Sequence, residues 1–449
     1  MEILIKVIQF LLSLSFIIVL HELGHFIPAK LFKVRIEKFY LFFDIKYSLF
    51  KKKIGETVYG IGWLPLGGYV KMSGIIDESM DKDQMAKPPQ PWEYRSKPVW
   101  QRLIIILGGV IVNFILSLVI FIGMAYNYGS VEIPLNSIQG GVLITNPLFN
   151  EIGFRTGDKI IEADGKKIMT YPDLRTSIIG TEKYTVDRGG ELIEINMPFD
   201  FLGQLSSSND NSTFELRAPY IIQSVSETSL NKNYDLQQGD IIVSINNQEI
   251  KYFDQSIPIL DENRNQTINV EILRNNVTYN KILNVDADGK LGLYTGVSKI
   301  DMASLGYLEL VNKSYSFGES IIKGSQNFVS FFDSYLDQVA AIFNPSTGAY
   351  KGLGGFIAIG NIFPGTWDWQ NFWGVTAILS IMLGILNVLP IPLLDGGHAV
   401  FLIYEMITGR KPSDKFVEAV SIAGLAILLV LVIYANGNDI YKLFNIIFF

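Results

Sequence analysis

The chain has 449 residues, of which 49% are hydrophobic and 18% charged. This composition, with a mean hydropathy of +0.27, is typical of a membrane protein with a sizeable polar part. The chain contains no cysteine, which excludes a disulfide scaffold and a cysteine-ligated zinc site. It also lacks a basic domain and the aromatic-basic pattern of nucleic-acid-binding modules, so we expect no nucleic-acid partner.

Residues 1–30 form the first long apolar segment, and we interpret them as a retained transmembrane helix. A cleaved signal peptide is the alternative, but the segment lacks a strong basic n-region and a small-residue cleavage site. His21, Glu22 and His25 stand near its end in the sequence HELGH. Four helical residues turn through about 400°, so the two histidines share one helix face. Two imidazoles at this spacing are typical zinc ligands, with the glutamate between them to handle a proton.

Ionisable side chains at membrane depth are costly and usually functional. The chain has only three histidines, and His21 and His25 are two of them. Two histidines supply half of a tetrahedral site, whereas a catalytic zinc takes three protein ligands and a water. We therefore expect a third ligand from another membrane segment.

Three further apolar segments are long enough to span about 30 Å of hydrocarbon, namely residues 103–127, 372–398 and 416–435. The loop of residues 31–102 carries more Lys and Arg than Asp and Glu, whereas residues 128–371 carry more Asp and Glu. Basic loops stay in the cytoplasm, so we expect this loop on the cytoplasmic side of the membrane and the acidic region on the outer side.

Residues 55–72 alternate β-forming residues with glycines and one proline. This pattern predicts a hairpin or reentrant β-loop beside the membrane. An exposed β edge at residues 59–70 is then available to pair with an extended substrate.

The acidic region contains an internal repeat. GFRTGDKIIEADGKKI at residues 153–168 matches DLQQGDIIVSINNQEI at residues 235–250 in register. Each copy has Gly-Asp, a strand, a tight turn and a second strand, which is similar to PDZ domains. We expect two tandem domains at residues 131–201 and 217–296, followed by a helical linker with interfacial segments at residues 303–371.

The third span contains candidates for the missing ligand. The sequence NVLPIPLLDGGH runs from Asn387 to His398, and Pro390 and Pro392 break its helix. A broken helix at membrane depth persists only where it lines a polar site. Asp395 and His398 are the candidates, and we favour Asp395 because it lies at the break.

HELGH together with NVLPIPLLDGG resembles the site-2 protease family of intramembrane zinc metalloproteases. The order of four spans, the β-loop ending LPLGGYVKM and the two PDZ domains is similar too, so the likeness covers essentially the whole chain. It implies that His21, His25 and Asp395 hold Zn2+ and that Glu22 is the catalytic base. We expect substrate contacts at Asn387, Pro390, Pro392, Gly67, Gly68 and Tyr69.

The chain departs from the family pattern in the second span. Gly108-Gly109-Val110 stands where the family has Ala-Gly-Pro, although an Asn follows at the expected place, Asn113. This departure concerns the substrate contacts that the resemblance implies and leaves the metal ligands untouched.

The resemblance implies a polytopic α-helical membrane protein with four transmembrane helices, a reentrant β-loop and two β-rich PDZ domains between the second and third helices. The resemblance also implies a location in the bacterial inner membrane, with the PDZ domains on the periplasmic side and the active site towards the cytoplasm. The substrates that it implies are single-span membrane proteins in the lipid bilayer, such as anti-sigma factors after a first cut or remnant signal peptides, in regulated intramembrane proteolysis. The PDZ domains bind peptide ligands or act as a size filter, and we favour the filter.

Two other classes of protein fit part of the pattern. An intramembrane ion transporter also places His, Glu and Asp in the membrane, but its repeats normally lie in the membrane part. A catalytically inactive PDZ scaffold has no reason to keep buried charges.

Overall fold

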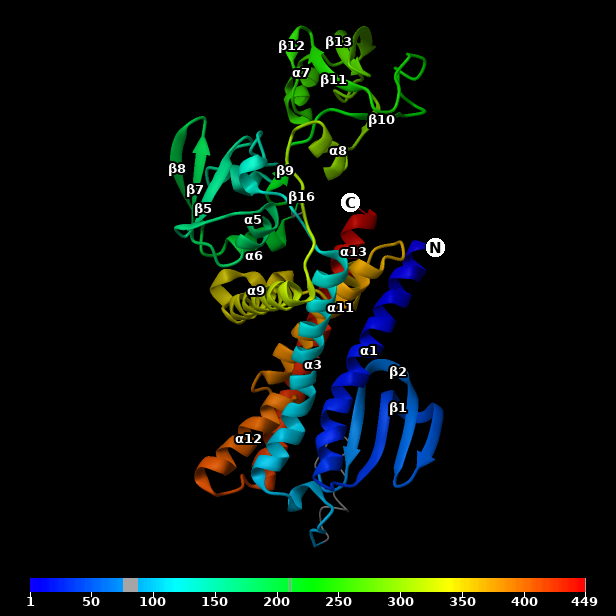
Figure 1. Cartoon of the computed structure of the whole chain (residues 1–449), viewed down its shortest axis with the longest axis vertical. Helices are drawn as coiled ribbons and strands as arrows, with labels where there is room; N and C mark the ends of the chain where they lie inside the picture. Colours follow the sequence, from blue (N-terminus) through cyan, green and yellow to red (C-terminus); the bar gives the residue numbers. More distant parts are fainter. Residues whose placement is uncertain (76–87, 209, 211, 449) are drawn as a thin grey trace. The chain divides into compact units, whose positions relative to one another are not determined.

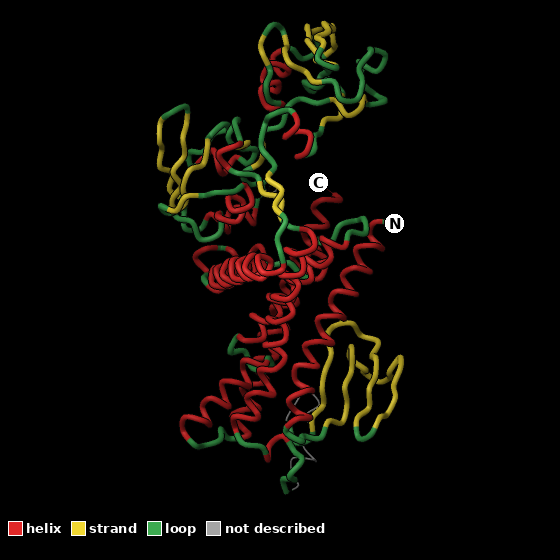
Figure 2. Tube along the Cα trace, in the orientation of Figure 1, coloured by secondary structure: helices red, strands yellow, loops and turns green. Residues whose placement is uncertain are grey.

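The computed structural model describes residues 1–75, 88–208, 210 and 212–448, so part of the predicted loop 31–102 lies outside the described residues. Two compact units make up the chain. The helical unit contains Met1–Gly129, Ser314–Val339 and Leu353–Phe449. The β-rich unit contains Ser130–Lys313 and Ala340–Gly352 (Figures 1 and 2).

Within the described residues, four helices are long and apolar enough to cross a membrane. They are α1 (Glu2–Leu31), α3 (Val99–Tyr128), α11 (Trp369–Val388) and α13 (Asp414–Phe448). The four expected apolar helices are therefore present. The last one is longer than the predicted segment 416–435.

Helices α1 and α3 meet at two glycines. A Cβ on Gly24 would lie 2.3 Å from the carbonyl oxygen of Gly108, and a Cβ on Gly108 would lie 2.0 Å from that of Gly24. Only glycine fits at either position, because the two backbones are in direct contact. Small residues of this kind let membrane helices approach closely, since apolar burial gives no driving force in lipid.

The third predicted span, residues 372–398, is broken into two helices, as its two prolines predict. Helix α11 ends at Val388, and Asp395 is the first residue of a separate helix, α12 (Asp395–Thr408). Leu389 has extended backbone angles, as expected for a residue that precedes a proline. The break thus places Asp395 at a helix N-terminus.

A buried ion pair joins α12 to α3. Arg102 Nη2 lies 2.7 Å from Glu405 Oε1, and both side chains are at most 10% exposed. Arg102 also donates through Nε to the carbonyl oxygen of Lys97. These contacts fix the helix that begins with Asp395 against the start of α3.

The β-loop is larger than predicted. Strands β1 (Ile36–Ile54) and β2 (Thr57–Met72) both bend back on themselves. Tyr59 pairs with Phe39 on one side and with Lys52 on the other. Four segments therefore lie in the order 48–54, 57–62, 36–43 and 64–72.

Two predictions about this loop are wrong. Residues 55–72 supply only half of the sheet, because the preceding strand contributes the other half through pairings that a local pattern does not reveal. Residues 59–61 lie inside the sheet and form no edge. Among the described residues of this sheet, only 48–54 and 64–72 have one unpaired side.

The β-rich unit contains two copies of one four-stranded sheet, as the sequence repeat predicts. The strands of the first sheet lie in the order β6-β5-β7-β8, and those of the second in the order β12-β11-β13-β14. Their bounds are Lys159–Ala163, Lys166–Lys167, Lys183–Arg188 and Glu191–Asn196 for β5 to β8, and Ile241–Ile245, Gln248–Glu249, Thr267–Arg274 and Val277–Asn284 for β11 to β14.

The Gly-Asp pair of each repeat has the same structural role. Asp158 pairs with Arg188 at 2.7 Å, and Asp240 pairs with Arg274 at 2.6 Å. Burial favours the neutral form of Asp240, but the hydrogen bonds from Arg274 outweigh it and lower the pKa of the carboxyl. Each aspartate thus ties the strand that follows it to a partner strand.

The first lobe of this unit extends beyond the predicted residues 131–201. Phe214 is fully buried in its core, together with Met302 and Leu308 from far along the chain. Strand β9 (Glu215–Leu216) pairs with β4 (Val142–Leu143). The second lobe has its own core, and β10 (Ile222–Val225) and β15 (Leu293–Thr295) both lie within the predicted residues 217–296.

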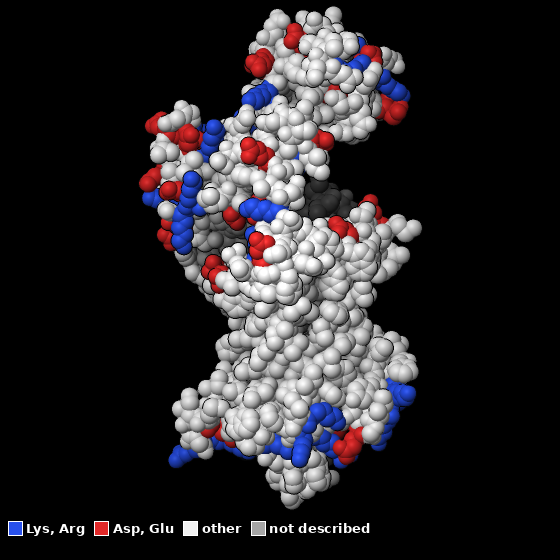
Figure 3. All heavy atoms as spheres, in the orientation of Figure 1, with Lys and Arg blue, Asp and Glu red and all other residues white. Residues whose placement is uncertain are grey.

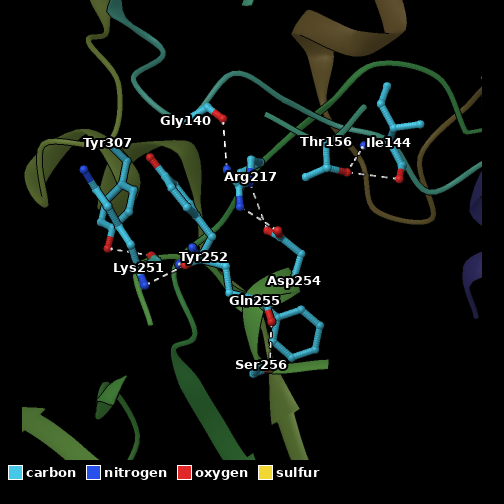
Figure 4. A network of polar contacts seen from close by, with 11 residues as sticks. Gly140, Ile144, Thr156, Arg217, Lys251, Tyr252, Asp254, Gln255, Ser256 and Tyr307 are labelled. Atoms are coloured by element: carbon cyan, nitrogen blue, oxygen red, sulfur yellow. Dashed lines mark hydrogen bonds and ion pairs between the residues drawn. The ribbon is translucent and has the colours of Figure 1, made fainter. Parts of the chain in front are cut away.

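Arg217 joins the two lobes (Figure 4). Its Nη1 donates to the carbonyl oxygen of Gly140, and its Nη2 lies 2.6 Å from Asp254 Oδ2. The guanidinium also lies 4.1 Å from the ring centroid of Tyr252, and Tyr252 packs against Tyr307. The guanidinium of Arg217 therefore contacts a carbonyl, a carboxylate and an aromatic ring at the same time.

The remaining elements are short apart from one amphipathic helix in the predicted linker. They are β3 (Ser130–Glu132), which pairs with β16 (Val311–Lys313), and the helices α4 (Pro147–Glu151), α5 (Tyr171–Ser177), α6 (Phe201–Ser207), α7 (Ser256–Glu262), α8 (Lys299–Ser304), α9 (Phe317–Phe343) and α10 (Phe356–Asn361).

The buried ion pair leads to a stability prediction. Arg102→Met should destabilise the helical unit by about 3–5 kcal/mol, because Glu405 is then buried without its partner. Adding Glu405→Leu should restore most of the loss, since two apolar side chains leave no buried charge. Thermal unfolding of the purified protein in detergent measures both variants. A double variant as unstable as Arg102→Met would contradict the assignment.

Candidate metal centre

Helices α1 and α12 bring three candidate ligands together. Among the described residues, His21, His25 and Asp395 form a group whose ligand atoms all lie within 4.8 Å of one another. His398 is not part of this group. The two histidines are one turn apart on α1, and Asp395 comes from the first turn of α12.

The three ligand atoms form a nearly equilateral triangle. Nε2 of His21 and Nε2 of His25 are 3.3 Å apart, and each lies 3.4 Å from Asp395 Oδ2. A tetrahedral zinc with bonds of about 2.0–2.1 Å requires ligand atoms about 3.3–3.4 Å apart. Asp395 Oδ2 is also buried and has no hydrogen-bond partner among the described residues. The donor set therefore fits one zinc ion and leaves a fourth position open.

Each imidazole is oriented through its other nitrogen. Nδ1 of His25 lies 2.8 Å from the carbonyl oxygen of Ile105, which accepts its hydrogen bond. Nδ1 of His21 lies 3.0 Å from the side-chain amide of Asn113. Asn113 Oδ1 has no partner in this orientation, and a 180° amide flip lets it accept the proton of Nδ1. Both contacts leave Nε2 free for a metal, as outer partners of metal-binding histidines usually do.

Gly109 of α3 lies directly against the two imidazoles. A Cβ at this position would be 2.4 Å from Nε2 of His25 and 2.6 Å from Cε1 of His21. The helix contact at Gly24 and Gly108 thus continues into the site. The backbone of α3 forms one wall of the metal centre, and no side chain fits between this backbone and the two imidazoles.

Glu22 is buried, with 8% of its surface exposed, on the helix turn that carries the two histidines. Strand β2 passes beside it at Gly68. A Cβ on Gly68 would lie 3.3 Å from Cγ of Glu22 and 2.6 Å from Cγ2 of Ile18. The segment of residues 64–72, which has an unpaired edge, therefore runs alongside the carboxylate.

The structure gives the predicted substrate-binding residues two locations. Asn387 lies in the last turn of α11, and Pro390 and Pro392 belong to the segment that leads to Asp395. Gly67, Gly68 and Tyr69 belong to the edge of the sheet, where the Tyr69 hydroxyl donates to Asp44 at 2.7 Å. Their contacts with a substrate stay predictions.

Sequence reasoning missed two residues of the site, Gly109 and Asn113. Both were noted only as positions in a family pattern. Asn113 is fully buried in a span without charged residues, and a polar residue at membrane depth is itself a functional indication. The role of Gly109 depends on which helices pack together, and a single sequence does not contain that information.

A membrane-embedded zinc metalloprotease is the class of protein that this bundle and this site define. The chain belongs to peptidase family M50, whose family model matches residues 9–431. Metalloprotease MmpA of Caulobacter vibrioides is 26% identical over 461 residues, which cover 99% of this chain and 98% of MmpA. A Rickettsia conorii protein named as a candidate zinc metalloprotease is 27% identical over 451 residues, covering 98% of this chain and all of its own length.

The contact between Gly109 and the imidazoles leads to a metal-binding prediction. Gly109→Ala should lower zinc affinity by about 10–100-fold, because its methyl group displaces the ring of His25. Gly123→Ala in the same helix is the matched control, since its Cβ meets open space. Zinc bound to the purified variants at fixed free metal measures the difference. Equal zinc content in both variants would contradict the proposed wall.

Proposed function

We propose that the chain is an intramembrane protease that cleaves single-span membrane proteins in regulated intramembrane proteolysis. The observation that supports this proposal is the ligand triangle beside Glu22, which lies on a helix long and apolar enough to span the membrane. Anti-sigma factors after a first cut and remnant signal peptides are the substrate types that we expect. An ion transporter does not require three ligand atoms at the distances of a zinc site with a glutamate beside them. The geometry therefore favours a protease over a transporter.

Glu22 acts as the general base and acid of this proposal. Its carboxylate takes the proton of the attacking water and passes it to the leaving amine. The chemistry that zinc supplies when bound is Lewis acidity, which polarises the scissile carbonyl and activates water. His21, His25 and Asp395 hold the metal, and Asn113 and the carbonyl of Ile105 keep both rings in place.

A transmembrane substrate must lose its helical structure before cleavage, because its amides are otherwise closed in i→i−4 hydrogen bonds. The edge at residues 64–72 supports pairing with the unwound segment, since an extended peptide adds to an open edge. Gly68 brings this edge against Glu22. The pairing surface is thus shorter than the predicted residues 59–70.

The two repeated lobes support a PDZ assignment, which we propose from their matching strand order. We place them on the periplasmic side and the site near the cytoplasmic side, in line with the charges of the loops. In this arrangement they exclude substrates with bulky outer parts and bind peptide ends on occasion.

Replacing the proposed base tests the chemistry. Glu22→Gln should keep its zinc and reduce cleavage of a single-span substrate by at least about a hundredfold, because the amide accepts no proton. Zinc analysis and cleavage assays on the same preparation measure both properties. Cleavage at the wild-type rate would refute the role of Glu22.

Adding a methyl group to the edge tests substrate pairing. Gly68→Ala should displace β2 at this point, because its Cβ would lie 2.6 Å from Ile18 of α1 and 2.8 Å from the carbonyl oxygen of Tyr40 in β1. We expect cleavage to fall by about tenfold or more with zinc content unchanged, since the ligands lie on other elements. A substrate with N-methylated amides around the scissile bond should lose cleavage in the wild type. Normal cleavage of that substrate would rule out pairing.

A further inference from the structure

The outer edge of the β1–β2 sheet combines apolar and basic side chains. It is formed by residues 48–54 of β1, on the side of the sheet away from the segment 64–72. Leu49 and Phe50 are 65% and 58% exposed. Lys51, Lys52 and Lys53 follow directly and are all exposed.

None of the three lysines is neutralised by an acidic side chain within the described part of the chain. Among the described residues, no ion pair involves Lys51, Lys52 or Lys53, and the neighbouring Glu56 lies 3.7 Å from Arg35 instead. On the face drawn in Figure 3, Lys and Arg gather at the end of the helical unit that carries this sheet. A band of the helices next to them is free of charged side chains (Figure 3).

The strand changes from apolar to basic along its length. At the bend that precedes it, Tyr47 and Trp63 are exposed and stacked 5.8 Å apart, and Trp63 Nε1 donates to the carbonyl oxygen of Ile45. Tyr and Trp side chains next to lysines are typical of the boundary between hydrocarbon and headgroups. An open strand edge is not stable in hydrocarbon, so its polar half must lie where water and phosphate oxygens reach it.

Lysines on an edge strand also prevent pairing with another chain. That role alone does not explain this strand, because exposed Leu49, Phe50 and Tyr47 would promote association in water. Apolar side chains beside a run of lysines instead suit a lipid surface. The apolar side chains bind its acyl region, and the lysines bind its negative charge.

We propose that Lys51, Lys52 and Lys53 form a binding surface for the headgroups of anionic phospholipids. Cross-strand pairs connect this surface with the inner edge: Lys52 pairs with Tyr59, Tyr59 with Phe39, and Phe39 with Val70. Headgroup binding therefore sets the depth of the sheet in the bilayer. Insofar as the proposed function holds, it also sets the depth of the substrate-pairing edge beside Glu22.

Native mass spectrometry of the full-length protein tests the surface directly. The protein is presented with equimolar phosphatidylglycerol and phosphatidylcholine, and the bound lipids are counted. Replacing all three lysines by glutamine should reduce the preference for phosphatidylglycerol by about tenfold or more, as three charges near a membrane surface imply. The control replaces Lys159, Lys166 and Lys167, which are equally exposed in the β-rich unit. An unchanged preference, or the same loss in the control, overturns the proposal.

A second measurement reports on the position of the strand. Because the chain has no cysteine, a Leu49→Cys variant carries an environment-sensitive dye at one place only. In nanodiscs, its emission should shift to shorter wavelength as phosphatidylglycerol replaces phosphatidylcholine, and added salt should weaken this shift. No shift, or new oligomers of the triple variant without a change in its lipid preference, contradicts headgroup binding. Neither readout depends on proteolysis, so a failed cleavage assay leaves this test intact.

Discussion

The backbone contact between α1 and α3 at Gly24 and Gly108 is the constraint on which the metal centre depends. It brings the two helices so close that Gly109 lies against both imidazoles and the carbonyl of Ile105 reaches Nδ1 of His25. A larger residue at either glycine would separate the helices by more than the contacts of the site tolerate. The same few residues therefore determine both how the helices pack and where the candidate ligands lie.

The proline break supplies what a continuous helix would not. A helix that continued from α11 would keep its backbone groups paired internally and carry Asp395 onward along its axis. Ending α11 at Val388 and starting α12 at Asp395 turns the carboxylate into the first residue of a new helix. The Arg102–Glu405 pair then holds α12 against α3 from within the bundle. Two prolines and one ion pair together place the third ligand.

The sequence was informative wherever a local pattern carries its own chemistry. HELGH predicted two candidate zinc ligands one turn apart on one helix face with a candidate base between them, and the carboxylate after two prolines indicated the source of a third candidate ligand. The repeat around Gly157-Asp158 and Gly239-Asp240 predicted two copies of one sheet, because each copy is built from neighbouring residues. The four apolar spans were recognisable for the same reason.

Features that depend on distant pairing were not predictable. Nothing local shows that Tyr59 pairs on both sides, so the local pattern predicts an edge where the structure has an interior segment. The core of the first lobe uses Met302 and Leu308, which follow the whole second lobe in the chain. Gly109 and Asn113 acquire their roles only when α1 lies beside α3. In each case the missing information was which elements meet, and no spacing within one segment contains it.

The bends in β1 and β2 determine which segments of the sheet lie inside it and which lie at its two edges. A flat hairpin of residues 55–72 would have left both of its outer sides unpaired, and unpaired strand edges favour association with other chains. By folding each strand once, the chain places residues 57–62 and 36–43 inside and leaves only two edges. One edge lies against α1 beside Glu22, and the other carries the lysines. In the proposed lipid-bound position, a helix or a substrate shields the inner edge, and the outer edge reaches the polar layer of the headgroups.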